Sequence, residues 1–319
     1  MDRTRRAHGR SLTELPTSAH PLVAELLARA TFPAEGTTVT CAVSGGADSL
    51  ALLVLAVAAG CTVTAVHVDH GLRSGSDTEA DVVAAAAARF GAEFRGERVQ
   101  LDDGPNLEAR ARAARLAVLP ADVFTGHTAD DRAETVLLHL IRGAGPAGAV
   151  GIARSRSKPL LDLRRADTVA LCAALGLEPV DDPSNRDPRF RRNRVRHELL
   201  PLIADIGERD PVPVLVRQAD LFASVDAVIA ERAAALDPAS AAQLADAPEA
   251  VAGAAVRAWL IGHGVGDGYG VDAAAVARVL DVARGAHVAT EVAGGWRVAR
   301  SHGVLSVGPP GAWQDAAHD

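Results

Sequence analysis

Residues 43–49 read V-S-G-G-A-D-S and lie between two apolar runs, residues 38–42 and residues 50–59. This order predicts a strand, a glycine turn and a helix. Such a turn forms an anion-binding cradle from its own backbone N–H groups and those of the helix N-terminus. We therefore expect a phosphorylated ligand to bind here, and the alternative is a chance glycine turn before a helix.

The composition of this loop excludes two common types of phosphate-binding loop. The P-loop of kinases and GTPases requires G-x-x-x-x-G-K-[ST], and the only lysine of the chain is Lys158. The dinucleotide fingerprint G-x-G-x-x-G also fails, because Gly45 and Gly46 are adjacent and no third glycine opens the helix. The loop instead resembles the S-G-G-x-D-S loop of the PP-loop ATP pyrophosphatases, which hold ATP for attack at the α-phosphate. The resemblance implies that ATP binds at Ser44, Gly45, Gly46, Ala47, Asp48 and Ser49.

Apolar runs rich in Val and Thr alternate with helical patterns through the first half of the chain. This alternation predicts an α/β fold with a doubly wound, Rossmann-like parallel sheet. In such sheets ligands bind beyond the carboxyl ends of the strands, where the loops at Ser44, Asp69 and Gly126 should converge. The expected strands are residues 38–43, 62–68, 92–99 and 122–125, and the expected helices are residues 48–59, 76–90, 106–119 and 130–142.

The second half of the chain predicts a different organisation. A Gly/Pro-rich segment, residues 143–151, should cross the site, and a helix over residues 166–175 should end at Gly176. Beyond a linker at residues 210–213 we expect a mainly helical region with a small C-terminal strand pair that turns at Gly294 and Gly295. The helices expected in that region are residues 214–234, 241–261 and 272–283.

Length and composition limit the domain organisation and the cell compartment. A chain of 319 residues with 48% hydrophobic residues is long for one compact domain. We predict a basic tail at residues 1–20, a PP-loop catalytic domain at residues 21–209 and a helical and small β region at residues 210–319. The sequence has no apolar run of about 18 residues and no apolar stretch after the basic N-terminus, so neither a membrane span nor an export signal is predicted. Three scattered cysteines, Cys41, Cys61 and Cys172, favour a reducing, cytoplasmic location.

Two acidic residues follow the fourth expected strand, in G126-H-T-A-D-D-R-A-E-T135. Asp131 and Glu134 are three residues apart and share a helix face. Two carboxylates beside a phosphate cradle suit Mg²⁺, which binds carboxylates together with phosphate oxygens and water, so we predict a metal or substrate role for this pair. A capping box between Thr128 and Asp131 is the competing explanation for Asp131, but it leaves Glu134 unexplained. The expected buried stripe of this helix is Ala133, Val136, Leu137, Leu140 and Ile141, with Arg132 at a tolerant surface position.

Two further segments carry weaker signals. His70 and Arg73 follow the second strand, where the other half of a nucleotide would lie, but each is equally well explained as an ordinary loop residue. Arg112 and Arg115 share a helix face with Glu108, and composition alone favours an ion-paired surface helix over a ligand site.

A basic patch stands out against the net charge of −7, which argues against general nucleic-acid binding. Six arginines lie between residues 183 and 198, with only Asp187 and Glu198 as acids among them. Such a patch can position a phosphate backbone, and Phe190 within it could stack on a base, although burial in a core is the stronger expectation. The predicted RNA-binding residues are Arg186, Arg189, Arg191, Arg192, Arg194 and Arg196.

Taken in order, these motifs and the D-P-S-N-R-D-P-R-F-R-R-N-R-V-R segment resemble the tRNA(Ile)-lysidine synthetase branch of the PP-loop family. The resemblance implies a ligase that forms a carbon–nitrogen bond on the wobble cytidine of a CAU-anticodon isoleucine tRNA. ATP adenylates the C2 oxygen and releases pyrophosphate, and the amine of free L-lysine then attacks C2 and expels AMP. The implied roles are Mg²⁺ binding for Asp48 and Glu134, phosphate neutralisation for Arg112 and Arg194, and cytidine or lysine binding for His127 and Asp131. Arg115 is a further predicted substrate or catalytic residue.

The resemblance leaves several points open. Lys158 replaces the usual arginine before Pro-Leu-Leu, and Arg132 replaces a common glutamine. Longer members have a further C-terminal domain that helps to hold the tRNA, and we expect this chain to recognise its RNA with the basic patch and the region after Asp210. No base is assigned for lysine deprotonation, and a homodimer is left open.

One alternative is another PP-loop enzyme, either a tRNA thiolase or a small-molecule amidotransferase synthetase. Thiolation requires a reactive cysteine pair or an iron–sulfur cluster, and the sequence has no C-x-x-C motif. The other alternative is a non-catalytic ATP-binding module.

Overall fold

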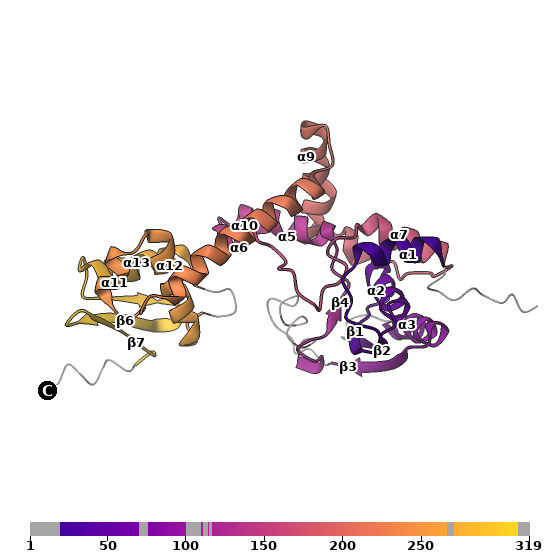
Figure 1. Ribbon diagram of the computed structural model, residues 1–319, viewed down its shortest axis with the longest axis horizontal. Coiled ribbons are helices and arrows are strands. Elements are labelled where there is room, and N and C mark those ends of the chain that lie inside the picture. The colour runs from indigo at the N-terminus through magenta and orange to yellow at the C-terminus, as the bar shows by residue number, and fades with distance from the viewer. Residues whose placement is uncertain are drawn as a thin grey trace, which may run out of the picture. The chain divides into compact units, whose positions relative to one another are not determined.

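The computed structural model describes residues 20–69, 76–99, 110, 114, 117–266 and 271–311 (Figure 1). The chain divides into two compact units, of which the first ends at Ala219 and the second begins at Asp220. Within the described ranges, no helix is long and apolar enough to cross a membrane. The predictions for residues 1–19, His70, Arg73, Arg112 and Arg115 lie outside the described residues, and the predicted boundary after residue 209 stays a prediction.

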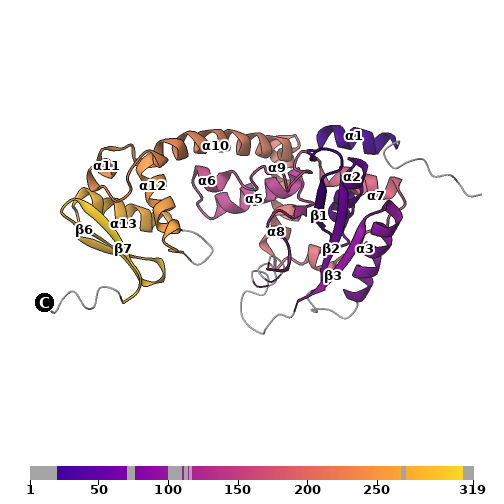
Figure 2. The same cartoon turned by 60° about the horizontal axis from the view of Figure 1, so that its bottom comes forward.

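A four-stranded parallel sheet forms the centre of the first unit (Figure 2). Its strand order is β3-β2-β1-β4, with Thr38 of β1 opposite Thr62 of β2 and Cys41 opposite Phe124 of β4. The predicted parallel α/β sheet is therefore confirmed. Because all strands run in one direction, the loops that follow β1 and β4 lie at the same edge. The strands are β1 (Thr38–Ala42), β2 (Thr62–Asp69), β3 (Glu93–Arg98) and β4 (Phe124–Thr125).

The largest core packs helices against one face of this sheet. Residues 49–56 of α2 are all buried, which explains why this segment is apolar on every side. Alternation along β2 turns Val63 and Ala65 toward this core and Val66 toward a smaller cluster with Leu119 and Val123. The helices of the large core are α1 (Pro21–Arg29), α2 (Ala47–Ala58), α3 (Ser76–Phe90) and α7 (Arg165–Ala174), of which α1 was not predicted.

A second cluster joins α5 to the arginine-rich segment. Ala133 and Leu137 of α5 pack against Val195, Leu200 and Val212. The predicted stripe is wrong at its C-terminal end, because Leu140 and Ile141 are 45% and 65% exposed in the last turn, where the helix has left this cluster. The elements are α5 (Ala129–Ile141), α6 (Pro146–Ala149), a 3₁₀ turn (Pro183–Arg186), α8 (Arg191–Arg194), a π-helix (Val195–Leu199), α9 (Leu200–Gly207) and α10 (Pro211–Ala234).

The second unit has its own core of helices on a three-stranded antiparallel sheet. The single helix predicted over residues 241–261 is wrong, since Pro248 divides it and holds Ala247 in an extended conformation. The predicted strand pair gains a third strand, and its turn at Gly294 and Gly295 has positive φ at both residues. The elements are α11 (Ala241–Asp246), α12 (Glu249–Gly262), α13 (Ala273–Arg284), β5 (Ala289–Val292), β6 (Trp296–Ser301) and β7 (Val304–Gly308).

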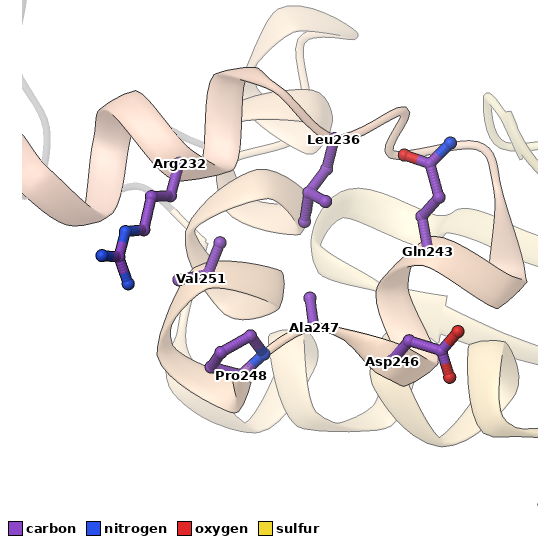
Figure 3. Close-up of a pocket in the computed structure, with 7 residues that line it drawn as sticks. All are labelled: Arg232, Leu236, Gln243, Asp246, Ala247, Pro248 and Val251. Atoms are coloured by element: carbon purple, nitrogen blue, oxygen red, sulfur yellow. The ribbon is translucent and has the colours of Figure 1, made fainter.

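The break at Pro248 lies beside a cavity of about 410 Å³ in the second unit (Figure 3). Leu236, Pro248 and Val251 supply apolar lining, and Gln243 and Asp246 lie on the α11 side. The Gln243 side chain accepts a hydrogen bond from the backbone N–H of Asp237, so it also closes the turn before α11.

Candidate active site

The phosphate loop after β1 is held in shape by its two serines. The Ser44 backbone N–H donates to the Ser49 hydroxyl at 3.1 Å, and that hydroxyl donates to the Gly46 carbonyl at 2.9 Å. Gly45 has a φ of 87°, a backbone conformation that residues other than glycine rarely adopt. The first N–H groups of α2 lack intrahelical acceptors and carry the positive end of its dipole. The predicted glycine turn before α2 is therefore confirmed, and anion binding at this turn stays a prediction.

Two other segments pack directly on this loop. A Cβ atom at Gly126, just after β4, would lie 2.5 Å from the Asp48 carbonyl oxygen, so only glycine fits there. In the loop after β1, the Gly45 carbonyl accepts a hydrogen bond from the Val180 backbone N–H at 3.0 Å. Gly126 leads to His127, whose Nδ1 lies 2.8 Å from the Thr125 hydroxyl. The structure therefore brings the loop and the start of the G-H-T-A-D-D segment together.

Asp131 both caps α5 and pairs with arginines. Its Oδ2 accepts hydrogen bonds from the Thr128 N–H and hydroxyl at 2.8 and 3.0 Å, which is the capping geometry. Its Oδ1 accepts from Arg165 at 2.8 Å and from Arg192 at 3.0 Å. Burial alone would raise the pKa of Asp131, but Arg165 and Arg192 hold that pKa below its ordinary value. The capping box predicted as one explanation of Asp131 is therefore confirmed, and its metal or substrate role stays a prediction.

Glu134 has no exposed side-chain surface and lies among three guanidinium groups. It accepts hydrogen bonds from Arg165 at 3.0 Å, from Arg192 at 2.8 Å and from Arg196 at 2.7 Å. These arginines come from α7, α8 and the π-helix, respectively. Arg192 and Arg196, which the sequence predicts as RNA-binding residues, are therefore engaged with α5 in this structure.

Arg165 connects the acids of α5 to the phosphate loop. In addition to Asp131 and Glu134, it contacts Asp48, with 3.4 Å between Arg165 Nε and Asp48 Oδ2. The Thr168 hydroxyl donates to the other oxygen of Asp48. Burial raises the pKa of Asp48 above its ordinary value, and the charge of Asp131 adds to the increase, against the opposing effects of Thr168 and Arg165.

The sequence reasoning missed Arg165, although a signal was present. Arg164 and Arg165 occupy the N-cap and first position of α7, where a cation is unfavourable against the helix dipole. Two arginines at a helix start therefore indicate acidic partners elsewhere in the chain. Here Asp130 accepts two guanidinium hydrogen bonds from Arg164 and one from the backbone N–H of Arg165, and the third guanidinium hydrogen bond of Arg164 goes to Asp210.

Comparisons with known proteins identify the family of this chain. The family model of the PP-loop domain matches residues 19–203. The tRNA(Ile)-lysidine synthase of Nocardia farcinica is 44% identical over 249 residues, which covers 73% of this chain and 78% of that protein. The chain belongs to the tRNA(Ile)-lysidine synthase family. The tRNA(Ile)-lysidine synthase of Rhodococcus erythropolis is 40% identical over 242 residues. That alignment covers 71% of this chain and 74% of the Rhodococcus protein.

Among solved structures, the U34-tRNA thiolase NcsA from Methanococcus maripaludis, with its [4Fe-4S] cluster, is similar to this member of the lysidine synthase family at a TM-score of 0.48. Its sequence identity is 20%, over 65% of this chain and 78% of that chain.

All three cysteines of the present chain are buried. Burial raises the pKa of the Cys41 thiol to about 12 and that of Cys172 to about 11, which disfavours thiolate chemistry at both.

Four of the six predicted RNA-binding arginines of this lysidine synthase family member lie on the surface. Three form exposed ion pairs with neighbouring acids, and such pairs contribute little to stability, so a phosphate can displace the acid. Phe190 is 39% exposed, and its expected burial in a core is wrong because it precedes α8 at the surface. The surface arginines are Arg186 (paired with Asp181), Arg189 (with Asp187), Arg194 (with Glu198) and Arg191.

Arg132 corrects another prediction. Its side chain is 1% exposed and is the largest fully buried side chain of the described residues, so the predicted surface position is wrong. The reason is visible in the helical spacing, since Arg132 lies three residues after Ala129 and four before Val136, both buried. A polar residue type obscured a position that belongs to the buried face.

Proposed function

We propose that this chain joins free L-lysine to C2 of the wobble cytidine of tRNA(Ile) with a CAU anticodon, converting ATP to AMP and pyrophosphate. The observation that carries the proposal is the preformed phosphate loop, residues 44–49, joined through Arg165 to the carboxylates of Asp131 and Glu134 in a chain of this family. An anion-binding loop next to a cluster of acids suits a reaction between a nucleotide and an amine.

In the first step the cytidine C2 oxygen attacks the α-phosphate of ATP, and pyrophosphate leaves. The N–H groups of the loop and the start of α2 are oriented to stabilise the phosphate charge in advance, which is a matter of positioning and electrostatics. Arg194 is proposed to neutralise phosphate charge, since it is exposed and its ion pair within the described residues is with the exposed Glu198. Arg112 and Arg115 are proposed for the same purpose from outside the described residues.

In the second step the lysine amine attacks C2 and AMP leaves. His127 and Asp131 are proposed to bind the cytidine or the incoming lysine. Arg165 and Arg192 lower the pKa of Asp131 and already donate to its Oδ1, so an ammonium group that binds Asp131 must replace one of these guanidinium groups. The negative charge of Asp131 opposes loss of the ammonium proton, so Asp131 is not proposed as the base.

Mg²⁺ is proposed as a cofactor that would neutralise phosphate charge when bound. None of the residues described by the structure form a cluster of three His, Cys, Asp or Glu side chains arranged to hold a metal. Asp48 fits better as a ligand, since it is 26% exposed in the first turn of α2 and its only guanidinium contact within the described part of the chain is the long one from Arg165 at 3.4 Å, while its other oxygen accepts from the Thr168 hydroxyl. Mg²⁺ can bind one carboxylate with phosphate oxygens and water. Glu134 does not fit in this arrangement, because both of its oxygens accept hydrogen bonds from guanidinium groups.

The surface arginines are proposed as the tRNA-binding patch. Arg186, Arg189, Arg191 and Arg194 lie within nine residues of one another in sequence and are all exposed. On a chain of net charge −7, a local basic patch can position a phosphate backbone while the rest of the surface does not attract nucleic acid. A cytoplasmic location and a homodimer also stay proposals.

The test is incubation with ATP, labelled L-lysine and a CAU-anticodon isoleucine tRNA transcript. We expect label in the tRNA together with release of AMP and pyrophosphate. A transcript with uridine at the wobble position is the matched control, because it lacks the cytidine. The variant Asp205→Asn, at an exposed position of α9, should remain active. ATP binding without label transfer would overturn the proposal in favour of a non-catalytic module.

A further inference from the structure

We propose that Arg165 is a positioning residue that sets the spacing between the phosphate loop and the acidic face of α5. This inference rests on the proposed function, because it assigns a residue to the same site. Sequence reasoning did not select Arg165, and its role emerges only from contacts between segments far apart in the chain.

The guanidinium of Arg165 reaches carboxylates on two different elements. Its Nη2 lies 2.8 Å from Asp131 Oδ1 and its Nη1 lies 3.0 Å from Glu134 Oε1, both on α5. Its Nε lies 3.4 Å from Asp48 Oδ2, in the first turn of α2. Each of the three nitrogens thus faces a different carboxylate, and the planar guanidinium presents them in fixed directions, whereas an ammonium donates from a single atom.

The backbone beneath this side chain is fixed to the same two elements. The Arg165 N–H donates to Asp130 of α5 at 2.8 Å. Three and seven residues later on the same face of α7, Thr168 donates to Asp48 and the Cys172 thiol lies 3.6 Å from the Ala47 carbonyl oxygen. The first turn of α7 is therefore anchored to α5 and its following turns to α2, so the guanidinium projects from a well-defined position.

Electrostatics gives this position its importance. Asp48, Asp131 and Glu134 converge in a site where all three side chains are largely or fully withdrawn from water. Like charges at this separation repel one another, and burial strengthens the repulsion. Arg192 and Arg196 neutralise the α5 acids from the arginine-rich segment, but their ion pairs are with Asp131 and Glu134. Loss of Arg165 should therefore separate the Asp48 side of the site from the α5 side.

The expected consequence is a loss of rate more than of ATP affinity. The serine contacts that shape the phosphate loop do not involve Arg165 and should survive its removal. The groups proposed to bind cytidine and lysine lie on the α5 side, and a displacement of about 1 Å between reacting groups can lower a rate by about 100-fold.

The test compares Arg165→Ala and Arg165→Lys with Arg217→Ala, a matched control at an exposed position of α10. For Arg165→Ala we expect kcat for tRNA-dependent AMP release to fall by about 100-fold, with a change in the KM for ATP below about threefold. Arg165→Lys should retain only part of the rate. Low-millimolar guanidinium chloride should restore part of the Arg165→Ala rate, whereas sodium chloride at equal ionic strength should not.

A second measurement does not depend on catalysis. Double-mutant cycles on the free energy of unfolding should show coupling of Arg165→Lys with Asp48→Asn and, separately, with Asp131→Asn. Additive effects in both cycles, or an unchanged kcat in Arg165→Ala, would overturn the inference. A fall of kcat in Arg165→Ala that is accompanied by a lower unfolding temperature, and that guanidinium does not restore, would also overturn the inference, because that pattern indicates a purely structural role. Failure of the proposed function looks different, since the unsubstituted chain would then modify no tRNA while the coupling persists.

Discussion

Arg196 binds Glu134 through two parallel hydrogen bonds, from Nε to Oε1 at 2.7 Å and from Nη2 to Oε2 at 3.1 Å, across 62 residues of sequence. The pair joins the π-helix to α5, and Glu134 is fully buried. Two-pronged contacts of this type combine charge with a fixed orientation. They show that part of the arginine-rich segment is a structural partner of the acid cluster.

Replacement of Glu134 by glutamine should destabilise the first unit. The change removes one of the two carboxylates that three guanidinium groups share and leaves Asp131 as the other. Removal of one partner from a buried ion pair costs about 3 kcal/mol. The measurement is urea unfolding followed by far-ultraviolet circular dichroism. Glu178→Gln, at an exposed position after α7, is the control and should change the free energy of unfolding little. Equal stability of the two variants would contradict the prediction.

Gly126→Ala should weaken ATP binding. The new Cβ would lie 2.5 Å from the Asp48 carbonyl oxygen and 3.1 Å from the Ser49 nitrogen, so the first turn of α2 must move. Overpacking of this kind costs about 1–3 kcal/mol, and part of the cost should appear as lower ATP affinity in calorimetric titration. Gly145→Ala is the control, because its φ is −74° and no atom lies within 4 Å of the new Cβ. ATP affinity unchanged in Gly126→Ala would show that the turn can relax.

The surface arginines and the inward-facing arginines should differ in their salt dependence. Arg189→Ala and Arg194→Ala should each weaken tRNA binding. Each should also make the fall of log affinity with log salt less steep by about 1, as expected for one lost phosphate contact. Arg192→Ala should change this slope less, because its guanidinium binds Asp131 and Glu134. Filter binding across a salt series measures all three.

Asp187→Asn provides the complementary change in this patch. It removes the acid that pairs with Arg189 at 2.6 Å and should strengthen tRNA binding. If this variant binds tRNA no more tightly, and Arg189→Ala no less tightly, Arg189 is not part of the RNA-binding surface.

Asp130 should make stability depend on acidity below neutral pH. Burial raises its pKa, but Arg164 and the Arg165 N–H outweigh burial and hold the pKa below the ordinary value of 3.8. The unfolded chain therefore binds the proton more readily, so this contribution to stability is present above about pH 4 and is lost as pH falls through the folded pKa.

Asp130→Asn tests this pH dependence directly. The variant should be about 2 kcal/mol less stable than the original chain at neutral pH, because charged hydrogen bonds are lost, and the difference should shrink toward about pH 3. Urea midpoints across this pH range supply the measurement. Asp205→Asn is the exposed control. A stability difference that stays constant across the range would contradict the assignment to Asp130.

Local patterns predicted most of the elements near the site. The alternation of apolar runs predicted the parallel sheet, the two glycines predicted the turn before α2, and Gly176 marked the end of α7. These features depend on neighbours a few residues apart, which is the range over which period and turn chemistry act. The capping of α5 by Thr128 was predictable for the same reason.

The pairing of charges was not predictable in the same way. A carboxylate such as Glu134 reads as a metal ligand, a salt-bridge partner or a surface residue until the chain is folded, because its partners Arg165, Arg192 and Arg196 are 31 to 62 residues away. Arg132 shows the opposite error, since a charged residue type outweighed a helical position that belongs to the buried face. The sequence thus specifies which groups are charged, and tertiary packing decides which of them face solvent.

The hydrogen bond from the Val180 N–H to the Gly45 carbonyl ties the nucleotide loop to the chain that enters the arginine-rich segment. A side chain at Gly45 would meet Val180 Cγ2 at 3.0 Å, so the two segments are in direct contact as well. Thermodynamic linkage makes such a contact reciprocal. Whatever factor ATP imposes through it on the affinity for tRNA, tRNA must impose on the affinity for ATP, and a measurement of either one fixes the other.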